Sequence, residues 1–541
     1  MWLQEYNPMG NEIVSGLVAF LPILLFLLCL TVFKLKGIYA AGLTLLVTLL
    51  MTVFIYKMPF DVALLSILLG VSKALWPIGY IVIMAVWLYK IAVKSGKFDI
   101  VGQSIVSISN DQRIQLLLIG FCFVSFLEGV AGLGVPIAIC AALLVTLGFH
   151  PIKAAGYCLI ANAATGAFGT VGIGVFTGAE VGNMDVLALS GLAALTLPLI
   201  SFIIPFMLIF IQDGVKGIKE IFPALITVST VFGLFQFITA KFIGPELTNV
   251  IPALLAMVAL AVLTKKWKPK NTFYEPGAER ERKPTKQSMK DIIAGWSPFY
   301  FLTFIIGIWS IPAFKNLFEP GGILDFTTLN IKIPGLHEKV IQSPPIALEE
   351  VAMPAIFHLD LLASTGTAIL VAILVTGIFF PVLKYRVRFQ LLGESIKELT
   401  TPVIIIVLVL SFASLSNFSG LSASIGLALA NTGKLFPLFS PILGWLGVFL
   451  TGSVVNNNAL FGGLQVVTAN QLGMNPSLFV AANTVGGSMA KPIAPTSIAI
   501  AAASVGKNGR ESEILSFTLK YSMALIAIIC ILNFIFSFII K

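Results

Sequence analysis

The sequence predicts an all-α polytopic membrane protein, and its composition and apolar patterning carry that prediction. Of the 541 residues, 57% are hydrophobic and only 11% are charged, whereas a soluble domain carries about a quarter charged residues. Long apolar runs follow one another along the chain, and at about 20 residues per crossing they supply roughly 12–14 transmembrane helices. We therefore expect residues 1–541 to form a single transmembrane domain embedded in membrane lipid.

The individual spans can be read from the apolar runs. The first run, 13–33, follows an N-terminus without a basic segment and is too long for a cleaved signal peptide, so we expect a true span. Further spans are predicted at 38–56, 74–93, 187–211, 221–240, 247–264, 294–312, 361–383, 401–417 and 516–540.

Lysine and arginine lie mainly in loops, and their positions predict the orientation of the chain. The net charge of +9 comes from basic residues in these loops, as the positive-inside rule predicts, and therefore gives no indication of nucleic-acid binding. Segment 265–291 holds nine basic residues against four acidic ones and predicts a cytoplasmic loop, as do 94–113 and 384–397. Segment 315–360 holds three lysines against six acids and predicts an external loop. Counting spans back from these loops places the N-terminus outside.

Two long regions, 114–186 and 418–506, are apolar but repeatedly interrupted by Gly, Pro, Asn and Thr. Three short motifs occur in the same order and at similar spacing in both regions. This order predicts two inverted repeats, at about 60–264 and 361–541, each with a re-entrant broken-helix hairpin, and paired breaks point to a transporter site. The alternative is chance, because Gly, Ala and Pro are frequent in membrane helices. The motifs of the first region are 127–136, 147–151 and 161–166, and those of the second are 450–453, 472–476 and 482–487.

The glycines of the first region indicate why a break there matters. Gly129, Gly132 and Gly134, followed by Pro136, make a continuous helix unfavourable. Irregular backbone survives in a membrane only when protein buries it or a wet cavity adjoins it. A half-helix N-terminus at such a break carries partial positive charge and suits a carboxylate ligand. The alternative is that the glycines only allow close helix packing.

Three charged residues stand out within or beside the apolar regions. Glu128 is the only acid between Asp111 and Glu180, and we expect it to carry the coupling proton, because ionisable groups inside spans are rare and functional. Its alternative is a carboxyl at a helix end near the interface. Lys491 is a candidate partner for a substrate carboxylate or for Glu128, or else a lysine that extends to the interface. Asp360 is a second acid candidate, more typical of the interface.

Neutral polar residues in the broken regions supply donors and acceptors for a hydroxy acid, or oxygen ligands for Na⁺. No metal-ligand cluster, nucleophilic triad or nucleotide-binding loop occurs, so neither metal nor cofactor is expected and a primary pump is disfavoured. The five cysteines lie scattered in apolar stretches and indicate no disulfide framework. The candidate substrate-binding residues, besides the three glycines and Lys491, are Asn162, Thr165, Thr451, Gly452, Ser453, Asn456, Asn457, Asn458, Asn483, Thr484 and Ser488.

Taken together, several motifs resemble the L-lactate permease family of bacterial monocarboxylate symporters nearly end to end. The pieces are individually ordinary, but their joint order is highly specific. They are Lys34–Gly37, Leu75–Ile78, Phe98–Ile100, the stretch 120–139, Ile243–Leu247, Trp309–Pro312, Phe418–Leu421, Leu443–Ser453 and Ala481–Thr484.

The resemblance implies uptake of L-lactate, and of D-lactate or glycolate, by proton symport across the bacterial inner membrane. It also implies a fold of the ion transporter superfamily, elevator-like movement and an association into homodimers. The chain departs from the family pattern after Thr-Gly-Ser, where Val454 stands in place of the usual acid. A Na⁺-coupled or differently selective organic-anion symporter is therefore an alternative, and a non-transporting receptor or enzyme is a third.

Overall fold

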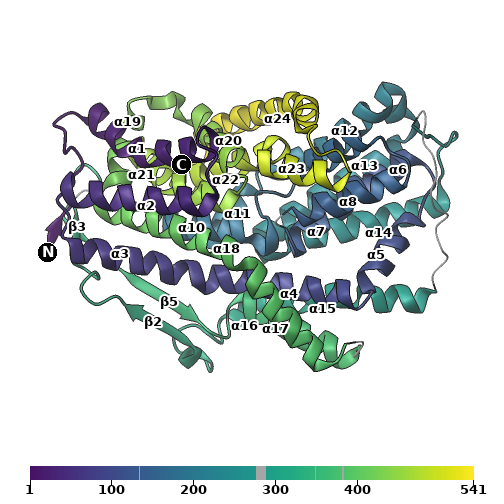
Figure 1. The fold of residues 1–541 in the computed structure, drawn as a ribbon, viewed down its shortest axis with the longest axis horizontal. Coiled ribbons are helices and arrows are strands. Elements are labelled where there is room, and N and C mark those ends of the chain that lie inside the picture. The colour runs from purple at the N-terminus through teal and green to yellow at the C-terminus, as the bar shows by residue number, and fades with distance from the viewer. Residues whose placement is uncertain (133, 276–287, 348, 381–382, 541) are drawn as a thin grey trace.

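The computed structural model is built almost entirely of helices, most of which run along the long axis of the molecule (Figure 1). Among the described residues, eleven helices are long and apolar enough to cross a membrane, which confirms the predicted polytopic all-α class. Part of the predicted basic loop, 276–287, lies outside the described residues, as does Leu133 of the first glycine motif. The structure describes residues 1–132, 134–275, 288–347, 349–380 and 383–540.

The N-terminal helices expose apolar stripes of the kind that face lipid. On α1, large apolar residues at 17, 21, 24 and 28 are exposed at helical spacing, while Gly16 allows close contact with Ala428 of α19. The first elements are α1 (Glu12–Thr31), α2 (Gly37–Phe54), α3 (Phe60–Lys73), the π-helical η1 (Ala74–Gly79), α4 (Tyr80–Lys94) and α5 (Lys97–Val106).

The first interrupted region lies at the centre of the molecule. Its leading helix, Gln112–Val130, is fully buried, whereas the other spans are half-buried or less, so protein rather than lipid surrounds it. Its elements are α6 (Gln112–Gln115), the π-helical η2 (Leu116–Phe123), α7 (Val124–Val130), α8 (Val135–Thr146), α9 (Pro151–Asn162), the 3₁₀ turn η3 (Thr170–Gly172) and α10 (Ile173–Gly182).

The middle of the chain packs around this region and then leads to the strand-bearing loop. The predicted span 187–211 is wrong as one continuous helix, because the chain turns at 194–196 between two helices. The elements are α11 (Val186–Ala193), α12 (Leu197–Glu220), α13 (Phe222–Ile238), η4 (Thr239–Ile243), η5 (Pro245–Leu247), α14 (Val250–Lys266), α15 (Met289–Ser310) and α16 (Pro312–Lys315).

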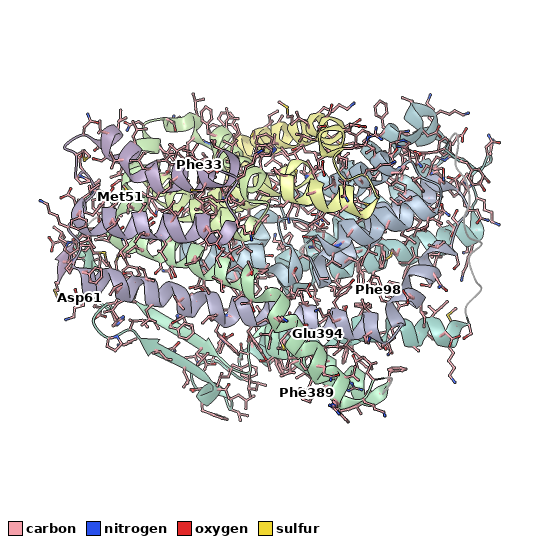
Figure 2. The ribbon with its side chains drawn as sticks, viewed as in Figure 1. Phe33, Met51, Asp61, Phe98, Phe389 and Glu394 are labelled. Carbon is pink, nitrogen blue, oxygen red and sulfur yellow. The ribbon has the colours of Figure 1, made fainter. Side chains whose placement is uncertain are left out.

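In the second half, the interrupted region from α20 to α23 has the same element order as the one from α7 to α10. The segment 384–397, predicted as a loop, instead forms the start of a long helix that projects at the lower edge, where Phe389 and Glu394 lie (Figure 2). The elements of the second half are α17 (Thr365–Phe379), α18 (Tyr385–Ser419), α19 (Leu421–Ala430), η7 (Gly433–Leu435), α20 (Phe436–Thr451), α21 (Val454–Gln471), α22 (Pro476–Ala490), η8 (Lys491–Ile493), α23 (Pro495–Ser504) and α24 (Glu511–Ile539).

The loop 315–360 and the N-terminus lie at one end of the molecule. The strand β1 (Trp2–Leu3) pairs in parallel with β3 (Val340–Gln342), so the two segments share a side. The prediction places both on the external side. The remaining elements of this loop are η6 (Asp325–Thr327), β2 (Thr328–Lys332), β4 (Val351–Ala352) and β5 (Ile356–Asp360), with β2 and β5 antiparallel.

The start of the predicted basic loop lies at the opposite end, near α6 (Figure 1). Buried Arg113 donates to the Asn271 carbonyl at 2.8 Å and pairs with Asp111, Asp213 and Glu220. Because these partners come from three segments, the start of α6, the helix α12 and the basic segment, Arg113 fixes this end of the helix bundle.

The two hairpins approach the centre from opposite ends of the molecule. The connection between α8 and α9 contacts the basic segment, where the His150 amide donates to Glu275 at 3.0 Å. The end of α21 contacts the strand-bearing loop, where Gln471 donates to the Pro345 carbonyl at 2.7 Å. Inverted repeats require this opposed arrangement.

Candidate functional site

Glycine turns break the helices of both regions at matching places. Gly132 and Gly134 follow α7 with φ of +52° and +85°, and Gly452 follows α20 with φ of +70°. A side chain at Gly132 would overlap Thr170 in the next break of the first region. A side chain at Gly452 would likewise overlap Thr496, which follows the next break of the second region. In each region the hairpin tip therefore contacts the broken helix that follows it.

The two regions also contact each other through their half-helices. Gly134 packs against Ile500 of α23, and Gly174 of α10 packs against Val454 of α21. Four half-helices, α8, α10, α21 and α23, thus begin close to one centre. Their N-termini bring partial positive charge to it, and this favours an anion.

A charged pair joins the two regions at this centre. Lys491 Nζ lies 3.8 Å from Glu128 Oε1, and the side chains are only 15% and 3% exposed, respectively. Asn162 Nδ2 donates to the other carboxylate oxygen, Oε2, at 2.9 Å. Glu128 lies in the last turn of α7, Asn162 ends α9 and Lys491 begins the break after α22. Three sequence-predicted residues from three breaks therefore meet.

The ammonium group of Lys491 has N–H donors that are free to bind a ligand. Within the described parts of the chain, its Nζ donates no hydrogen bond, and Glu128 at 3.8 Å is beyond ordinary hydrogen-bond distance. Asn162 Oδ1 is likewise buried without a donor. The centre thus offers one cation and one neutral acceptor, the groups that a 2-hydroxy carboxylate needs.

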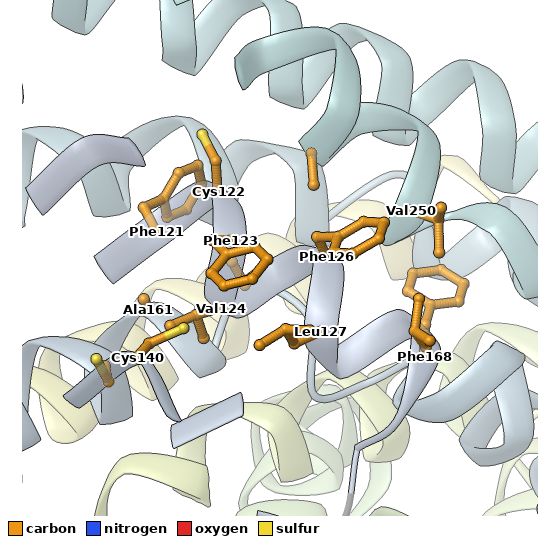
Figure 3. Close-up of a cluster of buried hydrophobic side chains, with 14 of the residues drawn as sticks. Phe121, Cys122, Phe123, Val124, Phe126, Leu127, Cys140, Ala161, Phe168 and Val250 are labelled. Atoms are coloured by element: carbon orange, nitrogen blue, oxygen red, sulfur yellow. The ribbon is translucent and has the colours of Figure 1, made fainter. Parts of the chain in front are cut away.

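Apolar side chains surround this polar centre. Leu127, next to Glu128, lies with Phe126, Phe168 and Val250 in a buried cluster (Figure 3). Such surroundings lower the local dielectric constant and strengthen the interaction between Lys491 and Glu128.

The backbone carbonyls of the break 163–172 accept hydrogen bonds from side chains of neighbouring elements. Ser488 donates to the Ala163 carbonyl at 2.8 Å and thereby ties α22 to the first region. Gln236 of α13 donates to the Ala164 carbonyl at 2.9 Å. Asn249 donates to the carbonyls of Thr165 and Gly169 at 3.0 and 3.1 Å. This supply of internal partners allows an open helix inside a membrane.

Gln236 and Asn249 bind carbonyls of the candidate site, and the sequence prediction did not include them. Each is a lone amide within or beside a long apolar span, and that isolation is the signal that would have identified them. Asn249 Oδ1 is also buried, and none of the described residues donates to it.

Asparagines of the second region form a hydrogen-bond network with one another. Asn458 Nδ2 donates to the Gly174 carbonyl at 2.8 Å, and Asn458 Oδ1 accepts from Asn483 at 2.9 Å and from Thr484 at 3.1 Å. Asn457 donates to the Asn483 carbonyl at 3.2 Å. These bonds hold α21, α22 and α10 together, although within the described residues Asn457 Oδ1 is buried without a donor.

The hairpin tip of the second region is capped by its own hydroxyls. Thr451 Oγ1 donates to the Gly447 carbonyl at 2.7 Å, and Ser453 Oγ accepts from the Asn456 amide at 3.3 Å. The Ser453 side chain therefore caps α21. Val454 begins this helix within a small buried apolar cluster.

The other predicted residues have clear positions outside the charged centre. Gly129 lies against Asn249 and Val250, which is a packing contact with α14. Thr165 lies in the break and its carbonyl is held by Asn249. Asp360 ends β5 in the strand-bearing loop and accepts from Trp76 Nε1 at 2.8 Å.

Two cavities of about 340 Å³ each adjoin the strand-bearing loop, and neither is lined by Glu128 or Lys491. One contains the ion pair between Lys73 of α3 and Glu180 of α10, at 2.6 Å. Across the described residues no three His, Cys, Asp or Glu side chains gather as metal ligands.

Comparison with known proteins identifies the family. The family model for L-lactate permease matches residues 15–540. This chain belongs to the L-lactate permease family. It is 48% identical to an L-lactate permease of Halalkalibacterium halodurans over 99% of both chains. It is 44% identical to the Escherichia coli L-lactate permease over 98% of both chains. The glycolate permease of Escherichia coli is also 44% identical, over 98% of this chain and 97% of its own.

Membership of this family confirms two predictions from the sequence. The resemblance read from the motifs is correct, and the family consists of permeases rather than enzymes. The protein is thus a multi-pass membrane permease.

Proposed function

We propose that this chain takes up L-lactate, and the related 2-hydroxy acids D-lactate and glycolate, across the bacterial plasma membrane by proton symport. Relatives named for L-lactate and for glycolate are 44–48% identical over nearly the whole chain. These two acids share a carboxylate and a neighbouring hydroxyl, which are the groups a common site would recognise.

The observation that carries this proposal is the Lys491–Glu128 pair at the meeting point of four half-helices. The substrate carboxylate would accept hydrogen bonds from Lys491 Nζ, whose donors are uncommitted. The substrate hydroxyl would donate to Asn162 Oδ1, which lacks a donor. Polar recognition of this kind discriminates against an acid without the hydroxyl.

Proton coupling follows from the charge balance of this pair. Before loading, Lys491 and Glu128 cancel one another. Lactate brings one negative charge to Lys491, and a proton on Glu128 removes one, so the loaded centre stays neutral. An unbalanced charge at membrane depth is costly, and this cost links lactate binding to protonation.

Alternating access would use the two hairpins. Their opposed approach supports inverted repeats, with the N-terminus and loop 315–360 on the external side and the basic segment in the cytoplasm. Elevator-like movement would carry the paired breaks past the surrounding helices. The Lys73–Glu180 ion pair, between α3 and α10, would open during that movement.

One observation favours Na⁺ as an alternative coupling ion. Asn162 Oδ1 and Asn249 Oδ1 are buried acceptors without donors, and amide oxygens are ligands for hard cations. Uptake of labelled L-lactate into proteoliposomes, under an imposed proton or Na⁺ gradient, separates the two. We expect accumulation to follow the proton gradient. Accumulation driven only by Na⁺ contradicts proton symport, and no lactate uptake under either gradient contradicts the substrate.

A further inference from the structure

One of the two cavities has an acidic lining. It lies between η5, α16, the end of β5 and the start of α11, and has a volume of about 340 Å³. Its charged residues are one base, Lys315, and four acids, Asp185, Glu246, Glu319 and Asp360. This surplus of carboxylates repels an anion such as lactate and attracts protons and cations.

Glu246 is the acid of this cavity with the least compensation. Its Oε1 accepts a hydrogen bond from Thr365 at 3.3 Å, but its Oε2 is buried and has no partner among the residues that the structure describes. Gly244, at φ +142°, provides the space, because a side chain there would overlap Oε2. A buried, unpaired carboxylate oxygen is costly while it is charged, and a proton on Oε2 removes that cost.

Glu246 differs from Glu128 in this respect. Both carboxylate oxygens of Glu128 face a partner, Lys491 or Asn162. Among the described residues, Thr365 is the one side-chain donor to Glu246, and Lys315 is the one base that lines its cavity. The two acids therefore suit different steps, one beside the substrate and the other open to the cavity.

The turn that carries Glu246 adjoins the first broken helix. A side chain at Gly172, which ends the break, would lie 2.7 Å from Pro245 Cβ. Asn249, three residues after Glu246, binds the carbonyls of Thr165 and Gly169. The turn that carries Glu246 thus contacts the break 163–172. A change in the charge of Glu246 would therefore act next to the segment that adjoins the proposed substrate centre.

The other three acids of the cavity differ in their exposure and in their contacts. Burial raises the pKa of Asp360 above its usual value, so this carboxyl binds a proton more readily than an exposed one. Asp185 caps α11 through the Ala188 amide at 2.7 Å, and Glu319 is exposed. The cavity therefore contains two exposed acids, Asp185 and Glu319, and two half-buried ones, Glu246 and Asp360.

We propose that this cavity is a proton-binding vestibule on the side of loop 315–360, and that Glu246 is the carboxylate that exchanges the coupling proton with that side. The inference rests on the proposed proton symport. In the step itself, one proton from water adds to Oε2 and later leaves from it, and no other bond changes.

The test compares wild type with E246Q in proteoliposomes, measuring lactate–lactate exchange and lactate accumulation under a proton gradient. We expect E246Q to lose about tenfold or more of its proton-driven accumulation while it retains exchange. E246D should restore part of the accumulation, because it returns a carboxylate. The control is E338Q, which alters a mostly exposed acid of the same loop outside the cavity and should accumulate lactate like wild type.

The outcomes separate the inference from the proposed function. If wild type accumulates lactate under a proton gradient and E246Q matches it, the vestibule is wrong and proton symport stands. If wild type does not respond to a proton gradient, proton symport fails, and the vestibule fails with it.

A second variant keeps Glu246 in place. T365V removes the donor to Oε1, which stabilises the charged form, so the dependence of uptake on external pH should shift to higher pH. An unshifted profile overturns the role of Glu246, even if E246Q cannot be reconstituted.

Discussion

The two interrupted regions have the same order of elements but differ in what occupies their breaks. In the first, Glu128 and Asn162 face Lys491 with donors and acceptors left open. In the second, Asn458, Asn483 and Thr484 satisfy one another. The comparison teaches that similar backbone breaks serve two purposes. In the proposed mechanism, one presents charge to the substrate, and the other fixes the helices that position it.

The largest effect is expected from K491Q, because Lys491 is the cation that joins the regions. Its loss removes the partner of both Glu128 and the substrate carboxylate. Loss of one member of a buried charge pair costs about 2–5 kcal/mol, so kcat/KM for L-lactate should fall about 100-fold or more. Uptake kinetics in proteoliposomes measure this. K434Q, on an exposed lysine of the turn η7 just before α20, is the control, and equal kinetics for both variants would contradict the assignment.

E128Q should separate coupling from transport. Glutamine keeps the size of the side chain and a contact with Asn162, but it cannot exchange a proton. We expect lactate–lactate exchange to continue and the accumulated lactate to fall to the external concentration. Wild-type accumulation by E128Q would remove Glu128 as the proton carrier.

N458A should act on stability rather than on recognition. It leaves the side chains of Asn483 and Thr484 and the Gly174 carbonyl without their shared partner. The expected loss is about 2–3 kcal/mol, seen as a lower Tm in detergent, with little change in KM for the protein that remains folded. N470A, on an exposed position of the same helix, should leave Tm unchanged. A large rise in KM with normal Tm would place Asn458 at the substrate instead.

The smallest effect should come from the glycine turns, and it should be similar in both regions. In the variants G132A and G452A, the alanine would have to adopt a positive φ, and its Cβ would overlap a threonine hydroxyl. We expect each to lose about 1–3 kcal/mol of stability. G473A has φ +64° and open space around it, so it should lose less. A cost for G132A and G452A no greater than that for G473A would show that the tips do not contact the following breaks.

Much of this architecture follows from the sequence, because membrane burial constrains it strongly. Spans such as 13–33, the glycine breaks, and Glu128 and Lys491 as lone charges were all readable from apolar patterning. Segment 384–397 was misread as a loop, since basic residues mark a side of the membrane without excluding a helix.

The residues that support the site were harder to find. Gln236, Asn249 and Glu246 each bind or adjoin a break that is remote in the chain. Their role depends on which carbonyl or glycine lies opposite, and only the three-dimensional fold supplies that. Likewise, the sequence could not distinguish an asparagine network that is satisfied internally from one open to substrate.

The central claim is that the Lys491–Glu128 centre binds the substrate. A cryo-electron microscopy structure of the protein with L-lactate tests it most directly. The account predicts density for lactate with its carboxylate within hydrogen-bond distance of Lys491 Nζ and its hydroxyl at Asn162. Lactate bound in either cavity beside loop 315–360, with the Lys491–Glu128 pair unchanged, would contradict it.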